Sequence, residues 1–400
     1  MSRTVRRAAP FLGAALAAAL AAAPSHAQSV LASRGLGYPI EPLDARARGL
    51  GGVTVGLPEP SFSMINPAAP VGLPAPGFVV TFQPDQYDAT AGAASASGTT
   101  SRFPLLQAAF PVGGRFTGSI GYGAFLDQHW QVEQADSLDL SGGRVPVTDR
   151  FVSTGAVARL RVGAGYRATD RLALGIAADV LTGAVRDSSI RVLSEDFIQS
   201  TSGVTYRYSG IGVSAGARWT PSDALTLAAA VTGGGEITAR ETDENNADDD
   251  DDVREEKSYA RPIEADVGAS ARIAQNAVVA ASARWTGWSA VDDELTAESG
   301  GARDALSASL GVEYEGVRLL GRPLPLRLGA RYTQLPFRWG LEGDTEFPEE
   351  RALSAGAGLR LAGGLARLDA AAERGQRGGG SAGFEEPFWR FSFSLSVLGR

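Results

Sequence analysis

The sequence predicts an all-β protein, a transmembrane antiparallel β-barrel of about fourteen strands with an N-terminal plug inside its lumen. Three observations predict this fold. Segments with alternating apolar and polar residues follow one another from residue 77 onward, short and long connections between them take turns, and aromatic residues gather near segment ends. Outer-membrane barrels combine lipid-facing alternation with short internal turns and long external loops. A soluble sandwich, the alternative, has no reason to alternate its connections so regularly.

The first 27 residues have the composition of a secretory signal peptide. A basic head precedes an unbroken apolar core from Phe11 to Ala23, and small residues around Ala27 suit cleavage. The alternative, a membrane anchor helix, needs an apolar core of about 20 residues, which is longer than the one present. We therefore predict an exported protein with a signal peptide at residues 1–27 and a location in the bacterial outer membrane.

Composition excludes several classes of function. The chain of 400 residues has a formal net charge of -8, and removing a signal with three arginines and no acid makes the mature chain more acidic still. This balance argues against a nucleic-acid partner, since such proteins concentrate basic residues. Cysteine is absent, which excludes disulfides and thiolate metal sites.

Residues 28–76 do not alternate and are predicted to form a plug. Eight prolines in this segment oppose regular sheet, because proline cannot donate a ladder hydrogen bond. Apolar residues such as Leu50, Phe62 and Ile65 are too frequent for a disordered tail. An irregular but folded element of this kind needs a container, and a barrel formed by residues 77–400 would supply one.

A family resemblance appears in this segment. The stretch 47–55, ARGLGGVTV, and the stretch 63–69, SMINPAA, resemble the N-terminal hatch of FadL-type outer-membrane transporters. PorV-like proteins of type IX secretion share this pattern. Turn chemistry alone would explain the Asn-Pro pair as an ordinary turn. The resemblance assigns the following residues to a hatch motif: Gly51, Gly52, Asn66, Pro67 and Ala68.

The parity of charged residues indicates which face of each strand meets water. Between Leu324 and Tyr332, leucines occupy one parity, whereas Arg327 and Arg331 occupy the other. An arginine or lysine that faces lipid at mid-bilayer costs about 2–4 kcal/mol, so the charged parity is expected to face the lumen. The charges assigned to the lumen are Arg159, Arg161, Asp179, Glu264, Asp266, Arg272, Glu313, Arg327, Arg331 and Arg360.

The same rhythm places the strands and their connections. The segment 130–140 also alternates and is expected to extend strand three beyond the membrane as a hairpin. Long polar connections are expected near residues 88–101, 128–149, 187–203, 241–257, 291–302, 338–349 and 377–386. The expected strands are approximately 77–87, 102–111, 115–127, 150–166, 172–186, 204–219, 224–240, 258–274, 277–290, 303–314, 324–337, 351–362, 365–376 and 387–398.

Glycines mark the third strand. Glycine inside a strand often indicates a bulge or a bend, and in FadL-type proteins a kink in strand three opens a side window. The resemblance therefore points to Gly118, Gly121 and Gly123 as a lateral opening, whereas close cross-strand packing is the alternative. The last segment, 391–398, resembles the C-terminal signal that the barrel-assembly machinery reads, and this machinery is an expected partner.

No residue pattern predicts catalysis, a metal or a cofactor. His129 lies beside Asp127 but no nucleophile motif accompanies the pair, so a loop side chain is the simpler interpretation. The run Asp248 to Asp252 could bind divalent cations loosely, but its spacing is not that of a calcium loop and solvation is the usual state of such runs.

Two functions follow from the resemblance. The first is a non-enzymatic channel for small hydrophobic compounds, such as long-chain fatty acids, with a lateral exit through the wall. The second is a PorV-like barrel that does not transport but anchors or shuttles secreted proteins. Outer-membrane lipid, lipopolysaccharide and a hydrophobic ligand are the expected partners. A soluble exported binding protein is the weakest alternative.

Overall fold

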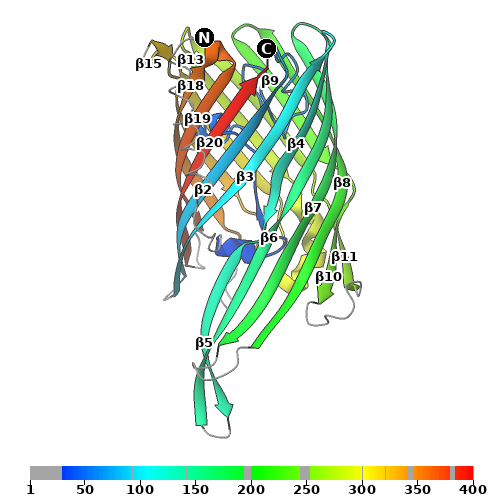
Figure 1. The fold of residues 1–400 in the computed structure, drawn as a ribbon, viewed down its shortest axis with the longest axis vertical. Helices are drawn as coiled ribbons and strands as arrows, with labels where there is room; N and C mark the ends of the chain where they lie inside the picture. Colours follow the sequence, from blue (N-terminus) through cyan, green and yellow to red (C-terminus); the bar gives the residue numbers. More distant parts are fainter. Residues whose placement is uncertain are drawn as a thin grey trace, which may run out of the picture.

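A single antiparallel sheet closes on itself in the computed structural model (Figure 1). The structure describes residues 29–91, 94–140, 143–192, 200–243, 253–299, 301–319, 321–339, 346–378 and 383–399. The first wall strand, β2 (Gly77–Ala91), pairs with both β3 (Ala94–Val112) and the last strand, β20 (Phe384–Leu398), so the ring has no free outer edge at its ends. Closure of this kind gives hydrogen-bond partners to backbone N–H and C=O groups that lipid cannot hydrogen-bond.

The described residues form a wall of fourteen strands, which confirms the predicted barrel. Two wall strands are each interrupted once: β9 (Leu225–Gly233) continues as β10 (Glu236–Asp243), and β11 (Val253–Ala260) continues as β12 (Glu264–Ala274). The uninterrupted strands besides β2, β3 and β20 are β4 (Phe116–Asp127), β6 (Gly143–Arg167), β7 (Leu172–Val192), β8 (Ser200–Ser222), β13 (Ala277–Thr286), β14 (Ala305–Tyr314), β17 (Leu326–Gln334), β18 (Glu349–Leu361) and β19 (Ala366–Gly378).

Backbone chemistry explains both interruptions. Gly234 and Gly235 have φ values of +86° and +75°, a region that glycine enters without steric cost and that ladder residues do not adopt. Pro262 separates β11 from β12 and has no backbone N–H to donate. The wall therefore bends at these two neighbouring points, close to the external end of the barrel.

The external end, at which the long connections lie, contains more sheet than the sequence predicted. The long connections predicted at 88–101 and 187–203 are mostly strand instead, so these two predictions were wrong over most of their length. The strand β2 continues to Ala91, β3 already begins at Ala94, and β7 continues to Val192. Threonine, isoleucine and valine, which favour strands, occur in these extensions at Thr99, Ile190 and Val192. The strand expected at 277–290 is shorter than predicted, since β13 ends at Thr286.

A hairpin beyond the membrane is confirmed. The strand β5 (Trp130–Leu140) pairs with the first part of β6, from Ser153 to Gly143. Figure 1 shows this hairpin projecting past the other strands at the external end. Short helices and bridges complete the described elements: η1 (Val30–Ser33), β1 (Tyr38–Pro39), α2 (Ala45–Gly49), η2 (Trp288–Val291), α3 (Asp292–Ser299), β15 (Arg318–Leu319), β16 (Arg322–Pro323) and η3 (Ala362–Gly364).

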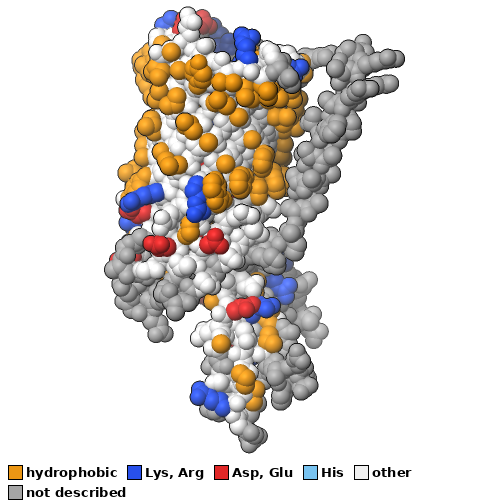
Figure 2. Space-filling view, turned by 90° about the vertical axis from the view of Figure 1, so that its left-hand side faces the viewer, with side chains coloured by type: hydrophobic (Ala, Val, Ile, Leu, Met, Phe, Trp, Pro, Cys, Tyr) orange, Lys and Arg blue, Asp and Glu red, His pale blue; other side chains and the backbone are white. Residues whose placement is uncertain are grey.

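The wall is apolar outside and charged inside. Leu328 and Leu353 are 67% and 69% exposed, whereas Arg327 and Arg331, on the opposite face of β17, are 1% and 7% exposed. Figure 2 shows the outer apolar side chains as a band around the wall. An exposed apolar belt over a charged interior is the arrangement of an outer-membrane β-barrel. Among the helices of the described residues, none has both the length and the apolar character needed to cross a membrane.

The N-terminal segment packs against the inner face of this wall. All five residues of α2 are buried, and Asp44 caps the helix by accepting a hydrogen bond from the Ala47 amide at 2.7 Å. The Ala45 amide donates to Ser394 Oγ of β20 at 2.7 Å, and the Gly51 amide donates to Ser354 Oγ of β18 at 3.0 Å. Residues from several strands thus contact one short segment, which requires that the segment lies between them.

Candidate functional site: the filled lumen and an opening in the wall

Two glycines of the wall allow the first half of the predicted hatch motif to pack directly against the backbone of the wall strands. Gly51 and Gly52 have φ values of +77° and +81°, and the chain there runs directly over β14 and β17. A Cβ added at Gly329 would lie 2.1 Å from the Gly51 amide nitrogen, and one at Gly311 would lie 2.5 Å from the Leu50 oxygen. Real side chains cannot occupy these positions, so the two wall glycines form a seat for the segment.

The second half of the motif is seated in the same way on β7 and β8. Asn66 accepts a hydrogen bond from the Ala68 amide at 2.8 Å and donates one to the Ala217 oxygen at 3.0 Å. One side chain therefore both forms the turn and fastens it to the wall. A Cβ at Gly175 would lie 2.4 Å from the carbonyl carbon of Pro67, and one at Gly216 would lie 2.2 Å from Asn66 Oδ1.

Buried ion pairs connect the segment to the wall. Arg331 of β17 reaches Glu41 of the segment at 3.1 Å, Glu350 of β18 at 2.5 Å and Glu373 of β19 at 3.0 Å. Arg48 of α2 adds a contact to Glu41 at 3.3 Å. Each of these charges is compensated by neighbours, as low-dielectric surroundings require.

A second group of ion pairs surrounds Arg46 of α2. Arg46 and Arg327 each approach Glu313 of β14 to 2.6 Å, and Arg327 also lies 2.8 Å from Asp369 of β19. The helix is thus fixed to the wall by a shared carboxylate.

A third group lies on the other side of the lumen. Arg161 binds Asp179 through two hydrogen bonds of 2.7 and 2.8 Å and donates to the Ile65 oxygen at 3.1 Å. Arg159 pairs with Glu264, and Asp266 accepts from Arg284 at 2.9 Å.

The structure brings together eight of the ten charges assigned to the lumen. Arg272 is exposed, because it lies beside the short turn that follows β12. Arg360 is half-buried near the opposite end of β18 from Glu350 and pairs with Glu315 at 2.7 Å. Both lie on the inward parity of their strands but at the turn end of the barrel. The partners of these arginines, and the wall glycines, escaped sequence analysis because pairing across hundreds of residues has no local signal.

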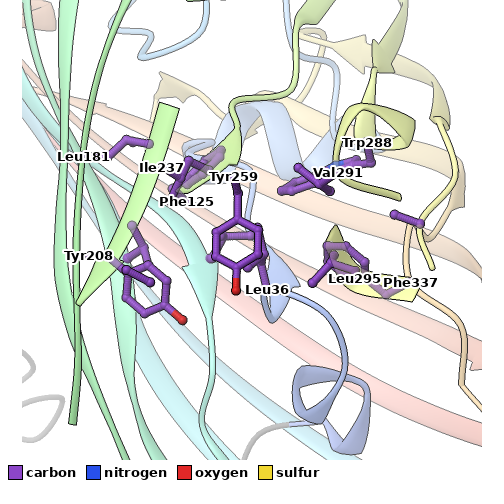
Figure 3. Close-up of a cluster of buried hydrophobic side chains, with 14 of the residues drawn as sticks. Leu36, Phe125, Leu181, Tyr208, Ile237, Tyr259, Trp288, Val291, Leu295 and Phe337 are labelled. Atoms are coloured by element: carbon purple, nitrogen blue, oxygen red, sulfur yellow. The ribbon is translucent and has the colours of Figure 1, made fainter. Parts of the chain in front are cut away.

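An apolar cluster closes the lumen at the external end. It joins Leu36 of the N-terminal segment to inward-facing side chains of the wall and to residues of η2 and α3 (Figure 3). Trp288 stacks on Phe125 with ring centroids 6.3 Å apart and meets Phe337 edge-on at 5.1 Å. Part of the long polar connection expected near residues 291–302 is therefore helical, and its apolar residues Val291 and Leu295 are buried in this cluster.

A small cavity lies between this cluster and the ion pairs. Its volume is about 70 Å³, and Phe125 and Trp288 line one side while Arg159, Arg284 and Glu264 line the other. A space of this size holds a few water molecules.

The hydrogen-bonded ladder of the wall is interrupted at a seam between β3 and β4. Their ladder runs from Val112 paired with Phe116 to Leu105 paired with Gly123, and no strand of the described residues continues it along β3 beyond that point. The free edge of β4 is instead taken by β1, with Tyr38 opposite Asp127 and the Ile40 amide donating to the Phe125 oxygen at 2.9 Å. The seam therefore lies in the external half of the wall, where β4 separates from β3 in Figure 1.

Of the three glycines predicted to open strand three, only Gly123 borders this seam. Gly118 and Gly121 stay paired on both sides, and Gly123 is the last residue of β4 that pairs with β3. Gly121 and Gly123 give room to the N-terminal segment, since a Cβ there would lie 2.4 Å from Met64 Sδ and 3.0 Å from Pro42 Cβ. The strand does not break at these glycines; a bulge follows them between Ala124 and Leu126.

Polar side chains bridge the seam from inside. Arg102 of β3 lies 2.9 Å from Asp85 of β2 and 3.8 Å from Asp127 of β4. His129 Nδ1 lies 2.8 Å from Asp127 Oδ1, so His129 belongs to this bridge, in a role that sequence analysis did not foresee. The acidic run Asp248 to Asp252 lies outside the described residues. Within the described ranges, no group of three or more His, Asp or Glu side chains is arranged to hold a metal ion.

Fold and interior together define a class: a fourteen-stranded transmembrane barrel with an N-terminal segment packed in its lumen. The chain belongs to the BamG family, whose model matches residues 7–400. None of the curated proteins is similar to it in sequence.

Solved structures show the same fold at low identity, as the resemblance implied. A FadL homologue of Pseudomonas aeruginosa is 15% identical with a TM-score of 0.60, over 90% of this chain and 99% of that one. The toluene transporter TbuX of Ralstonia pickettii is 15% identical with a TM-score of 0.59, over 90% and 98%. The monoaromatic hydrocarbon channel CymD is 15% identical with a TM-score of 0.56, also over 90% and 98%.

Proposed function

We propose that this protein is a channel that takes up small hydrophobic compounds and releases them sideways into the outer membrane. The observation that carries the proposal is the β3–β4 seam, where the ladder of the wall is interrupted and the edge of β4 pairs with β1 instead. An apolar molecule gains free energy by leaving water for hydrocarbon, so a lateral exit avoids the aqueous periplasm. The toluene and monoaromatic substrates in the names of TbuX and CymD support the same class of ligand.

In this proposal residues 28–76 act as the hatch, and the closed lumen is a resting state. The cavity of about 70 Å³ is too small to hold a fatty acid or an aromatic hydrocarbon. Transport therefore requires that the apolar cluster at the external end or the segment near Tyr38 moves. No step in this function needs bond chemistry, and the protein acts as a non-enzymatic channel.

Cross-linking across the seam tests the proposal. Cysteines replace Arg102 and Asp127, whose side chains approach to 3.8 Å, and a cleavable bifunctional maleimide joins them. Because the native chain has no cysteine, only these two positions react. Uptake of toluene or oleate by cells that carry only this variant is expected to fall to the level of the deletion strain and to recover when the linker is cleaved.

Each single-cysteine variant treated with the same reagent is the control and is expected to keep its uptake. Undiminished uptake through a fully cross-linked seam would exclude the lateral route, while loss in the controls would show that the reagent itself blocks the lumen.

A second candidate is a non-transporting barrel that serves partner proteins. The BamG family name points to the barrel-assembly machinery, and the sealed lumen and the projecting β5–β6 hairpin suit a docking role. This candidate corresponds to the PorV-like alternative, in which a barrel anchors or shuttles secreted proteins. Affinity purification from membranes separates the two: stoichiometric recovery of assembly or secretion components favours docking, whereas recovery of the barrel alone favours the channel.

A further inference from the structure

The outer wall carries a depression that faces lipid rather than the lumen. It has a volume of about 620 Å³ and extends across β14, β17, β18 and β19 to β20. Its floor consists of small side chains, Ala308 and Ala330, and of the backbone at Gly375. Leu310 and Leu353 border it and are 54% and 69% exposed. An apolar hollow at this position suits a hydrocarbon chain.

Two arginines, Arg351 and Arg374, line this depression. Arg351 is paired with Gln376 in the ladder, and Arg374 lies opposite Leu353 and Trp389. Both point outward, and the Arg374 guanidinium lies 5.5 Å from the centre of the Trp389 ring. Tyrosine and tryptophan favour the boundary between hydrocarbon and headgroups, so Trp389 and Tyr332 place the arginines at headgroup level. Figure 2 shows basic side chains, with acidic ones beside them, near the lower edge of the apolar band on one face of the wall.

The charges of the two arginines are incompletely matched by the protein. Arg351 has one carboxylate neighbour, Glu349 at 3.0 Å, which also accepts a hydrogen bond from the Tyr332 hydroxyl at 2.5 Å. Among the described residues, Arg374 contacts the Trp389 ring and has no carboxylate within ion-pair distance. The Arg351 side chain is 75% exposed. A lipid-facing guanidinium without an acid partner attracts a phosphate oxygen, with which it can form two parallel hydrogen bonds.

We propose that this depression is a binding site for a phosphate-bearing lipid of the outer leaflet, of the lipid A class. Arg374 and Arg351 bind the phosphate, and an acyl chain lies over Ala308 and Ala330 between Leu310 and Leu353. The site lies on the face of the barrel formed by β14 to β20, apart from the β3–β4 seam. It is therefore independent of the proposed transport route.

Native mass spectrometry of the full-length mature protein in detergent tests the proposal, with lipid A as the probe and dephosphorylated lipid A as the comparison. The double variant Arg351→Gln/Arg374→Gln is expected to bind lipid A about tenfold more weakly or worse, since each lost charge-assisted hydrogen bond pair is of that order. The variant Ala330→Phe keeps both charges, fills the floor and is expected to weaken binding as well.

The matched control is Arg240→Gln, which removes another exposed arginine, one that pairs with Glu256 at 2.8 Å. This control is expected to bind lipid A like the unaltered protein. The side chains at the four substituted positions, 240, 330, 351 and 374, point outward, so the substitutions are not expected to prevent folding. Heat-modifiable migration in gels verifies that each variant barrel is folded. The proposal is overturned by equal binding of lipid A to the double variant, or by equal binding of the dephosphorylated lipid to the unaltered protein.

Discussion

Replacement of Arg331 by methionine is expected to lower the free energy of unfolding by about 3–5 kcal/mol, the usual cost of removing one partner from a buried ionic group. Arg331 is 7% exposed and compensates Glu41, Glu350 and Glu373 at once. Methionine fills a similar volume but leaves three carboxylates facing one another. Other nearby arginines, such as Arg48 and Arg390, relieve part of this repulsion and set the lower end of the range.

Denaturant unfolding in lipid vesicles, followed by tryptophan fluorescence, measures this effect. The matched control is Arg351→Gln on the neighbouring strand, whose side chain is 75% exposed and has a single acid partner. Exposed pairs contribute about 0–1 kcal/mol, so the control is expected to unfold almost like the unaltered protein. A loss for Arg331→Met no larger than that of the control would show that the ionic group does not stabilise the fold.

The double variant Gly311→Val/Gly329→Val is expected to lift the N-terminal segment from the wall and open the lumen to ions. The added side chains would begin 2.5 Å from the Leu50 oxygen and 2.1 Å from the Gly51 nitrogen, distances that real contacts do not permit. The wall itself is anchored by ladders on both sides of β14 and β17, so the segment is the part that yields. Planar-bilayer conductance measures the result.

The control for this variant is Ala355→Val on β18, which points outward and is exposed to lipid. We expect the control and the unaltered protein to conduct little, and the double variant to show a stable increase in conductance. Protease cleavage within residues 28–76 should increase in parallel. Unchanged conductance together with unchanged protease resistance would mean that these glycines do not seat the segment.

Strand parity could be predicted because it is local. Arg327 and Arg331 alternate with leucines over a few residues, and the cost of placing an arginine in hydrocarbon decides which face is inside. The interruption at the glycines 233–235 could be located from the sequence, but not that the same wall strand resumes after them as β10.

Contacts between distant segments could not be predicted. Arg46 and Glu313 are 267 residues apart, and nothing in either neighbourhood identifies the other. The end of the β3–β4 ladder is likewise determined from a distance, since β1 takes the edge of β4. The glycines of strand three could be read from the sequence, whereas the position of the seam depends on the N-terminal segment.

The central claim is that one ring of backbone separates hydrocarbon outside from a charged interior, and spin-label accessibility tests it most directly. Single cysteines are introduced at neighbouring positions of opposite parity, Leu306 and Ser307 on β14, which are 44% and 7% exposed. In vesicles, the label at Leu306 is expected to collide with oxygen, which concentrates in hydrocarbon, and the label at Ser307 to be shielded from it. Higher oxygen accessibility at Ser307 than at Leu306 would contradict the barrel and every function proposed for it.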